Sequence, residues 1–170
     1  GEARAMKITN PEDIATAVTM IRPDSAELRV GIGTDAHAFS SDSSRPLWLA
    51  GILWPDIIGV DGHSDGDVAA HAICDALFSA TNLGDLGSNF GVSEPQYAGA
   101  SGISLLRETL SRVTQAGFEI ENVSVQIVCN KPKIGVRRAE AIAALSQALD
   151  GAPVSVTATS TDGLGFTGEG

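Results

Sequence analysis

Two short segments of this chain combine histidines with carboxylates at spacings that suit a metal ion. Asp35 and His37 are two residues apart at the end of an apolar run, and residues i and i+2 of an extended strand point to the same side. His63 and His71 stand among several aspartates further along the chain. Two histidines and one carboxylate that leave a coordination position open are typical of catalytic zinc. A histidine with an acid four residues before it is, on its own, more often a solvated surface pair, but the upstream Asp35-Ala36-His37 favours a metal site.

The second histidine segment is expected to open a helix that runs to about Ala80. Ser64 and Asp67 have the spacing of a capping box, in which both side chains accept orphan backbone N–H groups at a helix start. Asp67, His71 and Asp75 follow each other at intervals of four, so they share one face of that helix. The expected buried stripe consists of Val68, Ile73, Ala76 and Leu77.

Apolar periodicity predicts further strands and helices around these segments. Strands are expected at 28–34, 47–52, 123–127 and 154–158, and helices at 103–116 and 136–149. Strands that alternate with helices predict an α+β fold, an α/β sandwich in which a mixed sheet of four to five strands is covered by helices on one face. Residues 1–27, with a short capped helix near Pro11 and a turn at 22–25, are interpreted as a linker or tail, and residues 28–170 as the main domain.

Composition limits the partners of the protein. A formal net charge of −10 in 170 residues argues against a nucleic-acid partner, and no apolar run is long enough for a membrane span. The two well-separated cysteines are expected to be small buried residues of a reducing cytosol. Two polar turns, 131–135 and 159–162, offer donors for anions, and Asp162 offers an oxygen ligand for Mg²⁺. These residues together predict a metal-assisted reaction on a phosphorylated or otherwise anionic small molecule.

The order of these motifs resembles the 2-C-methyl-D-erythritol 2,4-cyclodiphosphate synthase family of the non-mevalonate isoprenoid pathway. The resemblance rests on Gly33–Phe39, on Gly62–Val68 with His71 and Asp75, on Gly84–Gly87, on Pro132-Lys133, and on Ala158–Asp162 with Leu164-Gly165-Phe166. It implies a lyase that forms the cyclic diphosphate and CMP from 4-diphosphocytidyl-2-C-methyl-D-erythritol 2-phosphate. It also implies a homotrimer with active sites between subunits.

Residue by residue, the resemblance assigns roles across the chain. It implies that Asp35, His37 and His71 hold zinc (or manganese), that Asp162 helps to bind magnesium, and that His63 and Ser160 stabilise the transition state. The residues that it places at the substrate are Ser64, Asp67, Asp85, Leu86, Gly87, Cys129, Asn130, Lys131, Pro132, Lys133, Ile134, Gly135, Thr159, Thr161, Asp162 and Phe166.

Some segments depart from the family pattern. Gly91-Val92-Ser93-Glu94 stands where the family commonly has Pro-Asp-x-Asp, and the end of the chain lacks an Arg and a closing segment, so the C-terminal end is expected to be incomplete. Residues 7–15 resemble the last helix of a cytidylyltransferase, which predicts that the chain is the cyclase half of a bifunctional bacterial, cytoplasmic enzyme.

Three other interpretations remain open. A metal-dependent phosphohydrolase would use the same two histidines and one aspartate. A non-catalytic metal- or nucleotide-binding module would keep its function without His71. A dinucleotide site at Gly31-Ile32-Gly33-Thr34-Asp35-Ala36 is disfavoured because no helix is expected to follow it.

Overall fold

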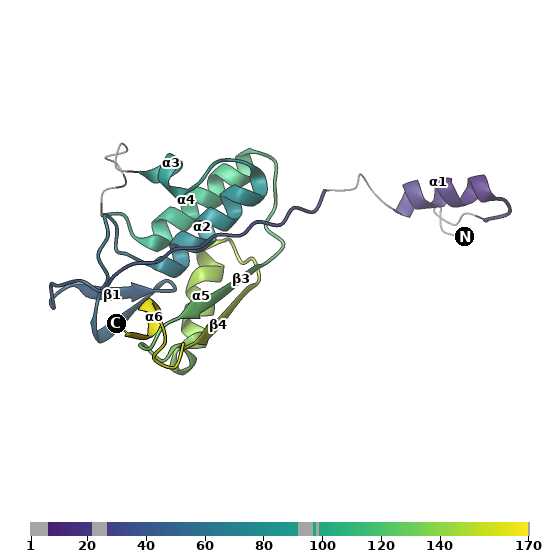
Figure 1. The fold of residues 1–170 in the computed structure, drawn as a ribbon. Helices are drawn as coiled ribbons and strands as arrows, with labels where there is room; N and C mark the ends of the chain where they lie inside the picture. The colour runs from purple at the N-terminus through teal and green to yellow at the C-terminus, as the bar shows by residue number, and fades with distance from the viewer. Residues whose placement is uncertain (1–6, 22–26, 92–96, 98, 170) are drawn as a thin grey trace.

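The computed structural model of the protein describes residues 7–21, 27–91, 97 and 99–169. The helices are α1 (Pro11–Ile21), α2 (Val68–Thr81), α3 (Leu86–Phe90), α4 (Gly102–Gln115), α5 (Arg138–Ala148) and α6 (Phe166–Glu169), and a 3-10 turn covers Ile134–Val136. The strands are β1 (Pro46–Leu49), β2 (Ile52–Ile58), β3 (Val123–Val128) and β4 (Val154–Thr159). Helix α1 stands clear of the other elements (Figure 1). The predicted turn at 22–25 lies outside the described residues.

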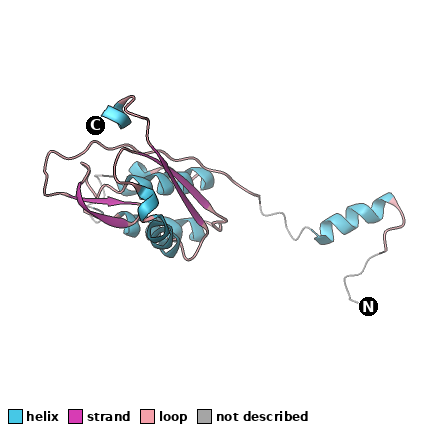
Figure 2. Ribbon diagram, turned by 90° about the horizontal axis from the view of Figure 1, so that it is seen from below, coloured by secondary structure: helices cyan, strands magenta, loops and turns pink. Residues whose placement is uncertain are grey.

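The strands form two separate pairs, so the mixed α+β character is confirmed at the level of secondary structure. β1 and β2 pair antiparallel, and β3 and β4 pair parallel with Val123 opposite Val154 (Figure 2). A single sheet of four to five strands is not formed within the described part of this one chain, and it stays a prediction. No helix in the described part of the chain is long and apolar enough to cross a membrane.

The single strand predicted at 47–52 is wrong, because the chain turns in the middle of that range. Ala50 and Gly51 both adopt positive φ, 55° and 79°, which is the backbone of a two-residue turn between antiparallel strands. Leu49 therefore pairs with Ile52 across the turn. The apolar pattern of the sequence could not reveal the turn, since alanine at position 50 is not a typical turn residue.

Helices α2, α4 and α5 build the core together with the two strand pairs. α2 packs against α4, and α4 against α5, which in turn packs against β4 (Figure 1). The expected stripe of α2 is only partly right, because Ile73 is buried whereas Val68, Ala76 and Leu77 are half-buried. Apart from Ile73, the buried residues of α2 are small or aromatic, and the whole set is Ala69, Ala70, His71, Ile73, Cys74, Phe78 and Thr81.

The predicted strand at 28–34 is an extended segment without strand pairing in the structure. Its side chains still alternate, since Leu28, Val30 and Ile32 are 76–83% exposed and Gly31 and Gly33 are half-buried. The half-buried glycines lie against α2, where a Cβ on Gly31 would come within 1.9 Å of the Ala76 carbonyl. Backbone packing on a helix thus takes the place of the expected ladder.

Candidate metal centre

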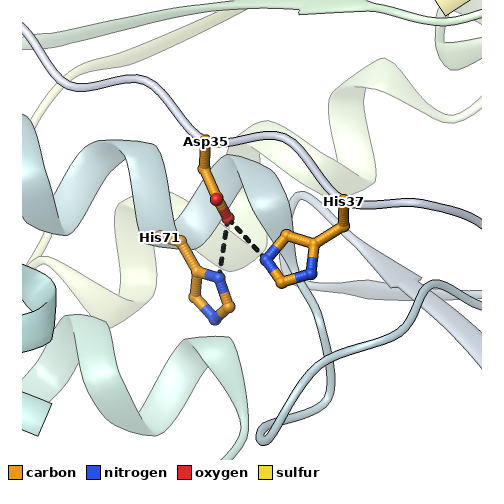
Figure 3. Close-up of side chains that lie close together, drawn as sticks. All are labelled: Asp35, His37 and His71. Carbon is orange, nitrogen blue, oxygen red and sulfur yellow. Dashed lines mark hydrogen bonds and ion pairs between the residues drawn. The ribbon is translucent and has the colours of Figure 1, made fainter. Parts of the chain in front are cut away.

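Asp35, His37 and His71 meet at one carboxylate oxygen. Oδ2 of Asp35 lies 3.0 Å from Nε2 of His37 and 2.8 Å from Nδ1 of His71. Asp35 and His37 directly follow the extended segment at 28–34, and His71 comes from α2. Both rings turn toward the same oxygen (Figure 3). The three ligand atoms lie within 4.8 Å of one another. The donor set fits a zinc-type ion with three protein ligands and room for a fourth.

The local electrostatics favour an ionised Asp35. Burial acts to raise the pKa of this carboxyl, but the hydrogen bond from His71 and the charges of the two imidazoles hold the pKa below its ordinary value. The side chain of His71 is 7% exposed and that of Asp35 is 22% exposed. An anionic oxygen in a partly desolvated site is a strong ligand for a divalent cation.

The remaining nitrogen of each imidazole has a partner of its own. Nδ1 of His37 contacts the backbone carbonyl of Asp61, and Nε2 of His71 lies 2.9 Å from the hydroxyl of Ser64. Such outer partners fix the ring orientation and the tautomer of a metal-binding histidine. This arrangement leaves Nε2 of His37 and Nδ1 of His71 as the metal-facing atoms.

The turn that carries His63 and Ser64 is held from both sides. The Arg45 guanidinium donates to the carbonyls of Gly62 and Ser64 at 2.9 and 2.8 Å. The carboxylate of Asp65 accepts from the backbone N–H groups of Asp67 and Gly102. Sequence reasoning missed Arg45, because nothing in its neighbourhood marks a residue that bonds 17 positions away.

The capping box predicted for Ser64 and Asp67 is wrong, because Asp67 is itself the N-cap of α2. One oxygen of its carboxylate accepts from Ala70 and Ala50 N–H, and the other accepts from Gly51 N–H at 2.6 Å. The residue is 1% exposed, and burial raises the pKa of its carboxyl against the three backbone donors. The carboxylate thus joins α2 to the β1–β2 turn, and a substrate contact by Asp67 stays a prediction.

The predicted substrate residues around α3 lie at its start. Asp85 is the N-cap of this helix and forms a capping box with Ser88, while Asp75 of α2 accepts from Leu86 N–H at 2.6 Å. Asp85 and Gly87 are exposed, and Leu86 is half-buried. Of the departing segment that follows Phe90, residues 92–94 lie outside the described part of the chain.

The two remaining polar turns lie together at the ends of β3 and β4. The parallel register places Val128 beside Thr159, and Cys129 N–H donates to the Thr159 carbonyl at 3.0 Å. Asn130 reaches the Gly168 carbonyl at 2.6 Å, and the Ser160 hydroxyl donates to Asp162 at 3.0 Å. Asp162 and Phe166 are exposed. Among the described residues, hydrogen bonds connect members of this group to each other, and none connects it to the metal triad.

Comparison with known proteins places this geometry in a family. Residues 28–170 match the YgbB family. A protein of Cutibacterium acnes named 2-C-methyl-D-erythritol 2,4-cyclodiphosphate synthase is 57% identical over 145 residues, which cover 85% of this chain and 84% of that protein. A solved structure of a 2C-methyl-D-erythritol-2,4-cyclodiphosphate synthase superposes with a TM-score of 0.75 at 36% identity, over 82% of this chain and 93% of that one.

A longer relative covers the N-terminal residues as well. The bifunctional enzyme IspD/IspF of Clavibacter michiganensis is 51% identical over 176 residues and matches 100% of this chain. The chain spans only 42% of the length of that relative.

Proposed function

The chain belongs to the YgbB family, and we propose that it is a 2-C-methyl-D-erythritol 2,4-cyclodiphosphate synthase. The proposed reaction converts 4-diphosphocytidyl-2-C-methyl-D-erythritol 2-phosphate to the cyclic diphosphate and CMP. The observation that carries this proposal is the meeting of Asp35, His37 and His71 at one oxygen. The 57% identical relative that bears the name of this synthase supports it.

Asp35, His37 and His71 would hold zinc or manganese, and Asp162 would contribute to a magnesium site. When bound, such cations polarise phosphoryl oxygens and neutralise their charge. The chain is acidic, with a net charge of −10, and without bound cations it would repel a substrate that carries several phosphates. Cations at the site would offset this repulsion.

The reaction is an intramolecular phosphoryl transfer. An oxygen of the substrate's 2-phosphate attacks the β-phosphorus, the bond from that phosphorus to the bridging oxygen breaks, and CMP leaves with the bonding electron pair. His63 and Ser160 are proposed to stabilise charge on the transferring group, and catalysis in such transfers comes mainly from positioning. Ser64, Asp67 and Asp85–Gly87 are proposed for the erythritol side and 129–135 for the cytosine side, with Thr159, Thr161 and Phe166 beside them.

The oligomeric state and the preceding domain of the protein are part of the same proposal. Because the predicted substrate residues fall into two groups that no described hydrogen bond connects, a site between subunits of a homotrimer would bring them together. The mixed sheet of four to five strands is proposed for that trimer. Residues 1–27 are proposed as the end of a preceding cytidylyltransferase domain, in line with the bifunctional relative, in the bacterial cytoplasm.

The direct test is incubation of the purified chain with the cytidine diphosphate substrate, zinc and magnesium, followed by phosphorus NMR. We expect equal amounts of CMP and the cyclic diphosphate. His71→Ala should abolish turnover, and Ser79→Ala, an exposed position on the same helix, should preserve it.

Other products would overturn the proposal in distinct ways. Inorganic phosphate in place of the cyclic product would identify a metal-dependent phosphohydrolase. No turnover by a folded protein that carries zinc would identify a binding module.

A further inference from the structure

The hydroxyl of Ser64 lies between one backbone donor and one imidazole at the edge of the metal centre. Its Oγ is 2.9 Å from Nε2 of His71 and accepts the backbone N–H of Gly66 at 3.2 Å. Nδ1 of the same imidazole lies 2.8 Å from Oδ2 of Asp35. Ser64, His71 and Asp35 therefore form a chain of hydrogen bonds through both nitrogens of one ring.

The direction of these hydrogen bonds follows from where the imidazole carries its proton. A carboxylate can only accept, so Nδ1 of His71 donates to Asp35. In the neutral imidazole Nε2 then carries no proton and accepts from the Ser64 hydroxyl. With a cation on Nδ1, the ring proton must sit on Nε2, which then donates to Ser64 Oγ. A hydroxyl suits both states, since it can donate or accept.

We propose that Ser64 is a positioning residue for the metal site, whose hydrogen bond to His71 reverses direction when the cation binds. This inference rests on the proposed metal centre and goes beyond the expected contact of Ser64 with substrate. After the reversal, the two lone pairs of Ser64 Oγ face the N–H groups of Gly66 and His71, and the hydroxyl proton is free. Metal binding thereby frees the Ser64 hydroxyl proton to donate to another acceptor.

The structure holds Ser64 in place by contacts that do not involve a metal. Arg45 donates to the Ser64 carbonyl and to the Gly62 carbonyl, and Asp65 ties the following residues to the start of α4. By contrast, the outer partner of His37 is the carbonyl of Asp61, which can accept only and fixes a single tautomer. Of the two metal-site histidines, only His71 therefore has an outer partner that allows the proton to sit on either ring nitrogen.

The first test measures zinc affinity of the whole chain by competition with a chromophoric chelator. Loss of an outer-shell partner typically costs 10–100-fold in metal affinity, so Ser64→Ala should weaken zinc binding by about tenfold or more. Ser64→Thr keeps the hydroxyl and should restore affinity to within a few-fold of the wild type. Ser79→Ala is the matched control and should bind zinc as the wild type does.

The second test observes the histidine nitrogens by NMR in protein labelled with ¹⁵N-histidine. On addition of zinc, His71 should change from the Nδ1–H to the Nε2–H form in the wild type and in Ser64→Thr. If the wild-type chain bound no zinc, the proposal of a metal centre would itself be wrong. Tight zinc binding that Ser64→Ala leaves unchanged, or a His71 proton that stays on one nitrogen throughout, would overturn the role of Ser64 alone.

Discussion

The backbone at Gly33 runs directly against the carbonyl of Ala72, one residue beyond His71 on α2. A Cβ on Gly33 would lie 2.1 Å from that oxygen and 2.5 Å from the Ala76 nitrogen. Gly31 makes the same close approach one turn further along the helix. Because side chains alternate along the extended segment, this contact places Asp35 opposite His71. The two glycines that formally match a dinucleotide fingerprint thus serve helix packing.

Gly33→Ala should therefore disturb both stability and the metal site. The added methyl group meets backbone atoms that cannot move aside, and overpacking of this kind typically costs about 1–3 kcal/mol. We expect a lower free energy of unfolding in urea and weaker zinc binding. Thr34→Ala, at the exposed neighbouring position, should change neither quantity. A Gly33→Ala chain with wild-type stability and zinc affinity would show that the segment does not depend on this contact.

Gly62→Ala tests the metal site with less effect on the fold. A Cβ at this position would lie 3.0 Å from Cε1 and 3.3 Å from Nδ1 of His37, which is closer than ordinary packing allows. The imidazole must then turn, and its contact with the Asp61 carbonyl weakens. Complete loss of an outer partner typically costs about 10–100-fold in metal affinity. Because Gly62→Ala only weakens this contact, we expect zinc affinity to fall several-fold while circular dichroism keeps the native spectrum.

The matched control for Gly62→Ala is Gly135→Ala, where the nearest atom to an added Cβ is 4.0 Å away. Its zinc affinity should equal that of the wild type. Equal affinities for both variants would contradict the claim that Gly62 is required for the orientation of His37.

Local patterns indicate each part of the candidate metal site, although His71 lies 36 positions from Asp35. Asp35 and His37 are two residues apart, and the helix that carries His71 has a clear periodicity. The helix at 103–116 and the strands at 123–127 and 154–158 follow for the same reason, and the structure confirms them nearly residue for residue. In each of these elements the apolar residues recur with the period of a helix or strand that buries one face.

What could not be predicted depends on contacts between distant segments. The Arg45 contacts and the partners of Asp67 at Ala50 and Gly51 join residues 16–19 positions apart. The extended segment at 28–34 has the apolar alternation of a strand, but its exposed apolar side chains have no partner among the described residues of a single chain. Periodicity reports which side chains share a face, whereas it does not report what that face packs against.

Asp67→Asn should destabilise the protein although it only replaces one carboxylate oxygen by an NH₂ group. The amide offers one acceptor oxygen in place of two, and its NH₂ group must face the N–H of either Gly51 or Ala50 and Ala70. An unsatisfied buried group costs about 1–3 kcal/mol, so the urea midpoint should fall by a corresponding amount. Asp150→Asn, on an exposed turn with positive φ, should stay within about 0.5 kcal/mol of the wild type. Equal midpoints for the two variants would mean that the N-cap of α2 is not needed for stability.

Arg112 of α4 holds α3 in place through several contacts of one guanidinium. It donates to Oδ1 of Asn89 at 2.7 Å and to the hydroxyl of Tyr97 at 2.9 Å, and it lies over the ring of Phe90 at 4.8 Å from the centroid. Lysine cannot reproduce a planar group that stacks and donates at the same time.

Arg112→Lys should therefore loosen α3 and the Asp85–Gly87 residues at its start. Because these residues are proposed to bind the erythritol part of the substrate, we expect KM to rise several-fold, with a smaller change in kcat and no change in zinc affinity. Steady-state kinetics and chelator competition measure the three quantities. Arg107→Lys, at an exposed position on the same helix, provides the matched control. A fall in kcat at unchanged KM would contradict a role in substrate positioning, because it would mean that Arg112 acts on the transferring phosphate instead.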